Sequence, residues 1–199
     1  SVIEQGCISS QRCAEISATF GWKEKWIDGA VLPQLSHWCA FSPVVATSDL
    51  GIDGHPGKGN FLPDLGLERR MWASGKLEFL KPLHVEEKLS RHIVIEKIDV
   101  KERPSGNMAF VTVAHEVSGE NGLAIKESQS IVYLSMPKSF EPPLKRSMPT
   151  SLVFEHRFSM PTTQLFRFSA ITFNAHRIHF DLPYAMEVEK YPGLVVHGP

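Results

Sequence analysis

The sequence predicts an α+β fold, because strand-like segments follow one another in the middle of the chain and a helical spacing precedes them. The strand-like segments are rich in Val, Ile, Phe and Tyr and are separated by polar turns; they are residues 76–80, 92–100, 108–117 and 128–134. This order is typical of an antiparallel sheet whose neighbouring strands are consecutive in the chain. Apolar residues alternate along the strands, so a helix or a second sheet must cover at least one face.

The helical spacing lies in residues 10–20, where Cys13, Ile16 and Phe20 follow at intervals of three and four, as on one face of an amphipathic helix. The next long segment, residues 31–65, is dense in Pro and Gly and predicts an irregular loop region anchored by apolar side chains. Long loops of this kind often line functional sites.

A proline-rich segment, residues 136–148, predicts a linker, because proline interrupts both helices and inner strands. After it we expect a strand over residues 153–159 and a helix that Thr162 caps and that runs through Ile171. A second unit is therefore expected to begin near residue 149.

Composition and charge exclude several classes of protein. With 42% hydrophobic and 22% charged residues, the chain has the composition of a globular protein and not of a disordered one. Lys and Arg total 21 against 22 for Asp and Glu. We therefore expect neither a nucleic acid nor a membrane as a partner, because no net charge attracts the chain to either.

The cysteines Cys7, Cys13 and Cys39 have no paired spacing, which indicates a reducing compartment. The chain has no apolar run near the roughly 20 residues that span a bilayer, and its start lacks a signal-peptide pattern. A cytoplasmic location is therefore predicted. Because the chain begins with Ser1, a targeting segment ahead of it stays an open alternative.

Two segments of the C-terminal part have the composition of a functional site. Residues 173–181, Phe-Asn-Ala-His-Arg-Ile-His-Phe-Asp, form the densest polar cluster, although a solvated helix end has similar composition. In residues 191–199 a short apolar stretch is followed by His-Gly-Pro, which is able to open a helix. Free N–H groups at such a helix start stabilise an oxyanion. A plain turn is the alternative interpretation.

Other chemistries have weaker support in the sequence. The histidines His176, His179 and His197 lack the spacing of a zinc motif, and no cysteine lies near them, so we expect no metal. The glycine-rich residues 54–60 depart from the phosphate-loop pattern and predict a mobile turn. No Gly-x-Ser-x-Gly motif is present, which leaves serine hydrolase chemistry unsupported.

Residues 170–181, followed by 191–198, resemble the hydratase signature of MaoC-like enzymes. The closer resemblance is to the branch of mesaconyl-CoA and itaconyl-CoA hydratases and mitochondrial hydroxyacyl-thioester dehydratases. Residues 32–38, 59–63 and 68–75 are similar to the N-terminal half of that branch. The resemblance covers nearly the whole chain.

This resemblance implies a double hot-dog fold, in which each unit wraps an antiparallel sheet around a helix. Residues 1–140 would form the N-terminal unit, which is catalytically degenerate and shapes the acyl pocket. Residues 149–199 would begin the C-terminal unit, which carries the hydratase motif and is expected to be truncated at its C-terminal end. Family members also lead us to expect a homodimer or a higher homo-oligomer.

The resemblance also implies the catalytic residues. The family pattern has an acidic residue five positions before a catalytic histidine, which places Asn174 at the position of the acid and His179 at that of the histidine. An amide is not a general base, so His179 is expected to transfer the proton while Asn174 orients water or substrate. The main-chain N–H of Gly198 is expected to hold the thioester carbonyl.

The function implied is that of a hydro-lyase, which adds water reversibly to an unsaturated acyl-CoA such as mesaconyl-CoA or itaconyl-CoA. No cofactor is expected, because CoA is part of the substrate. Arg177 or Arg167 would bind a distal carboxylate, and His176 and Trp38 complete the predicted substrate-binding set. The alternatives are a 3-hydroxyacyl-thioester dehydratase of fatty acid synthesis and a non-catalytic acyl-CoA-binding hot-dog protein.

Overall fold

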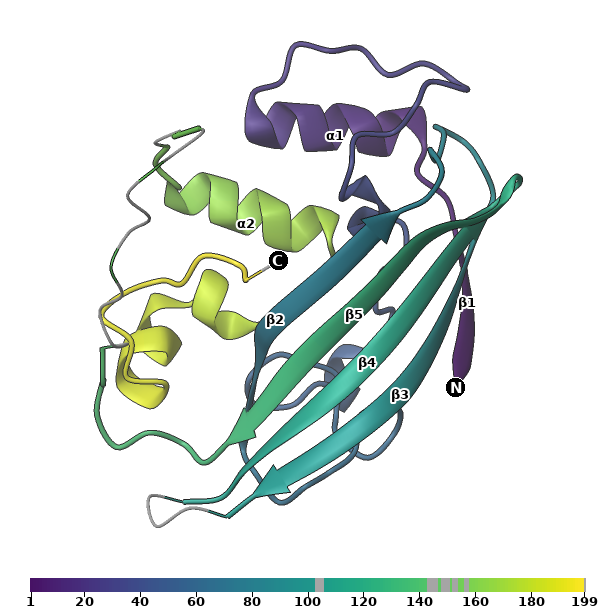
Figure 1. The fold of residues 1–199 in the computed structure, drawn as a ribbon. Helices are drawn as coiled ribbons and strands as arrows, with labels where there is room; N and C mark the ends of the chain where they lie inside the picture. Colours follow the sequence, from purple (N-terminus) through teal and green to yellow (C-terminus); the bar gives the residue numbers. More distant parts are fainter. Residues whose placement is uncertain (103–105, 143–146, 148–150, 152–153, 156–157, 199) are drawn as a thin grey trace.

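The computed structural model describes residues 1–102, 106–142, 147, 151, 154–155 and 158–198, and a curved antiparallel sheet dominates it (Figure 1). Within these residues the sheet has the strand order β1-β3-β4-β5-β2. The strands are β1 (Val2–Gly6), β2 (Arg69–Phe79), β3 (Leu89–Lys101), β4 (Met108–Gly119) and β5 (Gly122–Leu134). The α-helices are α1 (Ser10–Phe20) and α2 (Thr162–Ile171). Short helical turns follow at Ser36–Cys39, Thr47–Asp49, Arg177–His179 and Tyr184–Val188.

The expected strands are present, and each is longer than its predicted segment. Strand β1 was not predicted, because it is a five-residue edge strand that is largely exposed and carries no alternation of apolar residues. Helix α1 has the predicted bounds. Its N-cap Ser9 accepts a hydrogen bond from the main-chain N–H of Arg12, and the left-handed Gly21 ends it.

The C-terminal elements agree with the prediction in part. Helix α2 begins at Thr162, but Pro161 is its N-cap and makes no side-chain cap, so the prediction that Thr162 caps the helix is wrong. The predicted strand over residues 153–159 lies in part outside the described residues, and those described within it form no strand. Part of the predicted linker 136–148 also lies outside them.

One face of the sheet is covered by α1 and by the loops that precede β2. Side chains that alternate along β4 are fully buried on this face, among them Val111 and Val117. Near Val117 the cover comes from α1 and from Leu32 and Phe41, whereas Leu67 packs near Val111. A helix together with an irregular loop therefore provides the cover that the alternation requires.

Helix α2 lies beside α1 (Figure 1), and the contact is apolar. Ile16 of α1 and Ile171 of α2 are buried together with Cys39. The chain after α2 then folds back and forms a small apolar cluster around Ile178 and Tyr184. A hydrogen bond from the main-chain N–H of Arg177 to the main-chain oxygen of Asp53 joins this segment to the loop before β2. No helix in the described part of the chain is long and apolar enough to cross a membrane.

Candidate active site

Four histidine rings form a row beside α2. The ring centroids of His55 and His176 are 4.0 Å apart, those of His176 and His179 5.3 Å, and those of His179 and His197 3.6 Å. All four side chains line one cavity of about 650 Å³. The loop before β2, the first residues of β2 and the segment after α2 form its walls, so segments far apart in the sequence build it together.

The geometry defines the protonation of His179. Its side chain is buried, and Nδ1 lies 2.7 Å from the main-chain oxygen of Val195. A carbonyl oxygen only accepts hydrogen bonds, so Nδ1 carries the proton and Nε2 keeps the lone pair of a base. Burial lowers the pKa of His179; the Val195 carbonyl opposes this shift, and His55 adds to it. His179 is therefore neutral at pH 7 and able to accept a proton.

The two rings that flank His179 are neutral as well. Burial, together with the charges of His55 and His179, lowers the pKa of His176 to about 2. Burial and the nearby His179 lower the pKa of His197 to about 3, and its Nε2 lies 2.9 Å from Oγ of Ser169 on α2. Neither flanking ring therefore carries a positive charge near neutral pH.

We expect the protein to lose stability as the pH falls from about 6.5 towards 4. Burial also lowers the pKa of His115 to about 4, so His115, His176 and His197 stay unprotonated in the folded state across this range. In the unfolded chain histidines bind protons below a pKa of about 6.5, and each extra proton costs at most about 1.4 kcal/mol of stability per pH unit. Urea unfolding measured between pH 7.5 and 4.5 checks this, and a flat free energy of unfolding would contradict it.

Asn174 precedes His176 by two residues in the chain. Its Oδ1 accepts a hydrogen bond from the main-chain N–H of His176 at 2.9 Å. Because this turn occupies Oδ1, the amide Nδ2 is the group that Asn174 offers to a ligand. Asn174 lines both the 650 Å³ cavity and an adjacent one of about 610 Å³. The structure thus brings the predicted Asn174 and His179 to the same cavity.

Gly198 lines the same cavity, but the described residues show no helix start there. His197 and Gly198 are not helical, and Pro199 lies outside the described residues. A Cβ atom at position 198 would lie 2.9 Å from the ring of Trp72, so the cavity wall requires a glycine or a shift of the ring. The main-chain N–H of Gly198 donates to no acceptor among the described residues and remains available to a ligand.

Arg177 is not among the residues that line the cavity. Its guanidinium forms an ion pair with Asp181, with Nη2 and Oδ2 2.7 Å apart, and Nη1 donates to the main-chain oxygen of Ile52. It also lies over the ring of Tyr184. Through these contacts Arg177 holds the segment after α2 in place. The sequence analysis did not anticipate this structural role.

The other predicted substrate-binding residues are divided among separate surfaces. His176 lines the 650 Å³ cavity, whereas Trp38 lines the adjacent one and donates from Nε1 to the buried carboxylate of Glu127. Arg167 is exposed on α2, and its Nη1 donates to the main-chain oxygen of Ala18. Arg167 therefore does not reach the histidine row.

Sequence reasoning missed three residues that line or support the cavity. Asp53 is buried, His55 lines both cavities, and Arg70 lines the larger one with only 6% of its surface exposed. The turn predicted over residues 54–60 is present, but it places an imidazole in the cavity wall. The expectation that the long loop lines a site was the signal that pointed to Asp53 and His55, whereas Arg70 lies in β2.

Asp53, His55 and His176 place ligand-type atoms within 4.8 Å of one another, as the ligands of a metal ion would be. Oδ1 of Asp53 already accepts from the main-chain N–H of His55, and Oδ2 lies 2.9 Å from the Nδ1 of the same residue. The guanidinium Nε of Arg70 lies 4.0 Å from Oδ2. A cation would have to displace these hydrogen bonds beside a positive charge, so the group fits an acid-base pair better than a metal.

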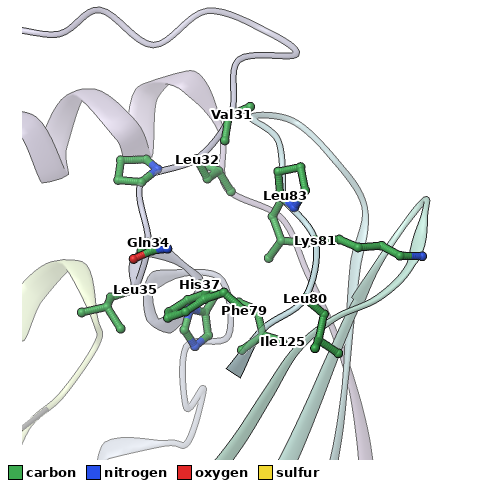
Figure 2. A pocket seen from close by; sticks show the side chains of 12 residues that line it. Val31, Leu32, Gln34, Leu35, His37, Phe79, Leu80, Lys81, Leu83 and Ile125 are labelled. Carbon is green, nitrogen blue, oxygen red and sulfur yellow. The ribbon is translucent and has the colours of Figure 1, made fainter. Parts of the chain in front are cut away.

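A separate hollow of about 300 Å³ lies at the other end of β2 (Figure 2). Leu35, Phe79 and Leu80 lie around it, while the side chain of Lys81 extends away from it. Phe79 is the last residue of β2, roughly 20 Å along the strand from Trp72 in the histidine cavity. The predicted site residues do not line this hollow, which is mostly apolar.

The fold and the histidine site define a hot-dog protein of the MaoC-like class. A solved MaoC-like dehydratase from Phytophthora capsici superposes with a TM-score of 0.67 at 13% identity, over 99% of this chain and 69% of that one. A model of the hydroxyacyl-thioester dehydratase type 2 family matches residues 35–199. The chain belongs to this family, which confirms the predicted α+β hot-dog fold.

Two curated proteins are similar to the chain in sequence. The mesaconyl-C(4)-CoA hydratase of Chloroflexus aurantiacus is 43% identical over 175 residues, which is 84% of this chain and 60% of that protein. The mitochondrial hydroxyacyl-thioester dehydratase type 2 of Schizosaccharomyces pombe is 28% identical over 188 residues, 82% of this chain and 62% of that protein. The chain spans about three fifths of the length of these relatives.

Proposed function

We propose that the chain carries the active site of a hydro-lyase that adds water reversibly to an α,β-unsaturated acyl-CoA. The observation that carries this proposal is the state of His179. Its Nδ1–H is held by the Val195 carbonyl, which leaves Nε2 as a base in the wall of a cavity large enough for an acyl thioester. We propose no cofactor, because CoA is part of the substrate.

Besides the base, the reaction needs hydrogen-bond donors. As the water oxygen bonds to the β-carbon, negative charge moves to the thioester oxygen and requires hydrogen-bond donors. The main-chain N–H of Gly198, which has no acceptor among the described residues, and the Nδ2 of Asn174 are donors in the same cavity wall. We assign the thioester oxygen to Gly198 and the orientation of water or substrate to Asn174.

The substrate that we favour is a short dicarboxylic mono-CoA ester such as mesaconyl-CoA or itaconyl-CoA. The relative from Chloroflexus aurantiacus, which carries the name mesaconyl-C(4)-CoA hydratase, supports this choice. So does Arg70, a buried cation of the cavity wall: its Nη2 donates to the main-chain oxygen of Pro56, and its Nε, which makes no hydrogen bond among the described residues, lies 4.0 Å from Oδ2 of Asp53. A guanidinium of this kind matches a free carboxylate. Arg70 therefore replaces Arg177 as the residue that we assign to the distal carboxylate.

We expect the protein to prefer mesaconyl-CoA to crotonyl-CoA, which lacks the carboxylate, when the loss of the double bond is followed by absorbance. Arg70→Met should lower the ratio of the two kcat/KM values about 10- to 100-fold, because a charged hydrogen bond contributes about 1.5–3 kcal/mol. Arg177→Met should leave that ratio as it is, since its guanidinium is paired with Asp181. A ratio that falls only in Arg177→Met would return the carboxylate to Arg177.

A dehydratase of fatty acid synthesis is the second candidate, and one observation favours it. The 610 Å³ cavity beside the histidine row has an aromatic wall, to which Phe166, Phe168 and Phe180 contribute, and such a surface suits a longer acyl chain. A rate that rises from crotonyl-CoA to a twelve-carbon enoyl-CoA would support this candidate. Binding of either thioester without turnover would instead support the non-catalytic alternative.

The division into units 1–140 and 149–199, a cytoplasmic location and a homo-oligomeric state are part of the same proposal. They rest on the resemblance and on the sequence features given above. Size-exclusion chromatography with light scattering tests the oligomeric state directly.

A further inference from the structure

The loop before β2 brings a carboxylate-imidazole pair into the wall of the histidine cavity. Asp53 is buried, with 7% of its surface exposed, and its Oδ2 lies 2.9 Å from Nδ1 of His55. His55 lines both the cavity that contains His179 and the adjacent aromatic cavity. We propose that His55, oriented by Asp53, is a second acid-base group of the hydratase site and exchanges the proton at the α-carbon. This inference rests on the function proposed above.

The hydrogen bonds of the pair fix the orientation of the His55 ring. Asp53 accepts twice from His55, from the main-chain N–H at 3.0 Å and from the ring Nδ1. The ring therefore has one nitrogen on the carboxylate and only Nε2 left for a ligand. A carboxylate in this position also stabilises the imidazolium that forms when the ring is protonated. Asp53 is thus a positioning residue and His55 a catalytic one.

The loop is locked to the segment that carries His179. The main-chain N–H of Arg177 donates to the main-chain oxygen of Asp53 at 2.9 Å. Gly54, with φ at +87°, passes so close to Ala175 that an added Cβ atom would lie 1.9 Å from its main-chain oxygen. This contact holds the His55 ring against His176, whose other neighbour in the row is His179. The distance between the two acid-base groups is therefore set by main-chain contacts.

The chemistry of the site gives a second acid-base group a definite task. Hydration takes one proton from water and delivers one proton to the α-carbon. His179 accepts the first on Nε2, while Asn174, five residues before it, is an amide and transfers no proton. The groups left in the row, His176 and His197, have pKa values of about 2 and 3 and so carry no proton to donate. Among the described residues that line the cavity, His55 is the remaining imidazole and the one with a carboxylate partner.

Each proton and electron pair of the hydration has a defined source and destination. Nε2 of His179 takes a proton from water, the hydroxide oxygen bonds to the β-carbon, and the electron pair of the double bond moves to the thioester oxygen as an enolate. The enolate collapses, and its α-carbon takes the Nε2 proton of the His55 imidazolium. His55 ends neutral and His179 protonated, and one proton passes through solvent from His179 to His55 before the next turnover. The net change is the addition of one water molecule.

His55→Gln should lower kcat about 10²- to 10³-fold with little change in KM, because a positioned proton donor contributes a factor of this size. Asp53→Asn should have a smaller effect in the same direction. The matched control is His84→Gln, since His84 also pairs with a carboxylate, that of Glu87 at 3.5 Å, outside the cavity. Thermal unfolding of each variant shows whether it folds as the unsubstituted protein does.

A kinetic isotope effect distinguishes catalysis from a structural role. In the dehydration direction, a 3-hydroxyacyl-CoA with deuterium at the α-carbon should show a larger primary effect in His55→Gln, because removal of the α-proton becomes the slow step. A loss of kcat without a rise in the isotope effect would overturn the assignment of His55, as would an unchanged kcat. Wild-type protein that hydrates none of the enoyl-CoA substrates would instead overturn the proposed function itself. Dialysis against EDTA that abolished activity would favour a metal at Asp53, His55 and His176 over the acid-base pair.

Discussion

Replacing His179 with glutamine is expected to lower kcat for enoyl-CoA hydration by about 10²- to 10⁴-fold while KM changes little. The proposed function assigns the proton transfer from water to the imidazole Nε2, because Nδ1 is hydrogen-bonded to the Val195 carbonyl at 2.7 Å. Glutamine keeps a donor for that carbonyl but supplies no group that accepts a proton at pH 7. Steady-state kinetics with crotonyl-CoA and mesaconyl-CoA measures the loss.

Two further measurements make this result specific to His179. The thermal midpoint of His179→Gln should stay within a few degrees of that of the unsubstituted protein, which separates lost chemistry from lost folding. His84→Gln, whose side chain does not line the cavity, should keep full activity. If His179→Gln retained kcat within about threefold, the assignment of His179 as the base would be wrong.

Gly54→Ala is expected to destabilise the protein by about 3–5 kcal/mol and to abolish hydration. A side chain at this φ of +87° costs about 1–2 kcal/mol, and the new methyl group would overlap the oxygen of Ala175, which adds an overpacking cost. Relief of the overlap would move the Asp53 loop away from the histidine row. Urea unfolding measures the first effect and kcat the second.

Gly59 provides a matched control in the same loop. Its φ is +99°, yet an added Cβ atom would have no neighbour within 4 Å, so Gly59→Ala should cost only the conformational 1–2 kcal/mol and keep activity. Equal destabilisation by the two substitutions would contradict the idea that Gly54 is needed for the close contact with Ala175.

The secondary structure was predictable where local signals agree. Helix α1 has both an apolar face and a capping Ser9, and in β4 buried residues alternate with more exposed ones from Met108 to Val117. Strand β1 lacks such a signal, because its identity as a strand comes from pairing with β3, which is distant in the sequence. Main-chain hydrogen bonds to a partner strand do not require a pattern of apolar residues in the sequence of a short exposed strand.

The site was predictable only in its C-terminal half. The resemblance pointed to Asn174 and His179, which the structure brings to one cavity. Nothing local to Asp53 and His55 indicates that they meet a segment more than a hundred residues away. The prediction for Arg177 overlooked a signal that was present, since Asp181 follows at the i+4 spacing at which opposite charges pair. A contact between distant loops depends on the packed fold, whereas a pairing within one segment can be recognised from spacing.

The docking of the Asp53 loop onto the main chain at Ala175 and Arg177 has a consequence for how the protein can be divided. Severing the backbone in the proline-rich stretch around Pro142 would leave one product with the carboxylate-imidazole pair and another with the base. Each product would be inert alone, and mixing them would restore turnover only as they reassociate. A gene that encoded only one of the two pieces would therefore not encode the complete site.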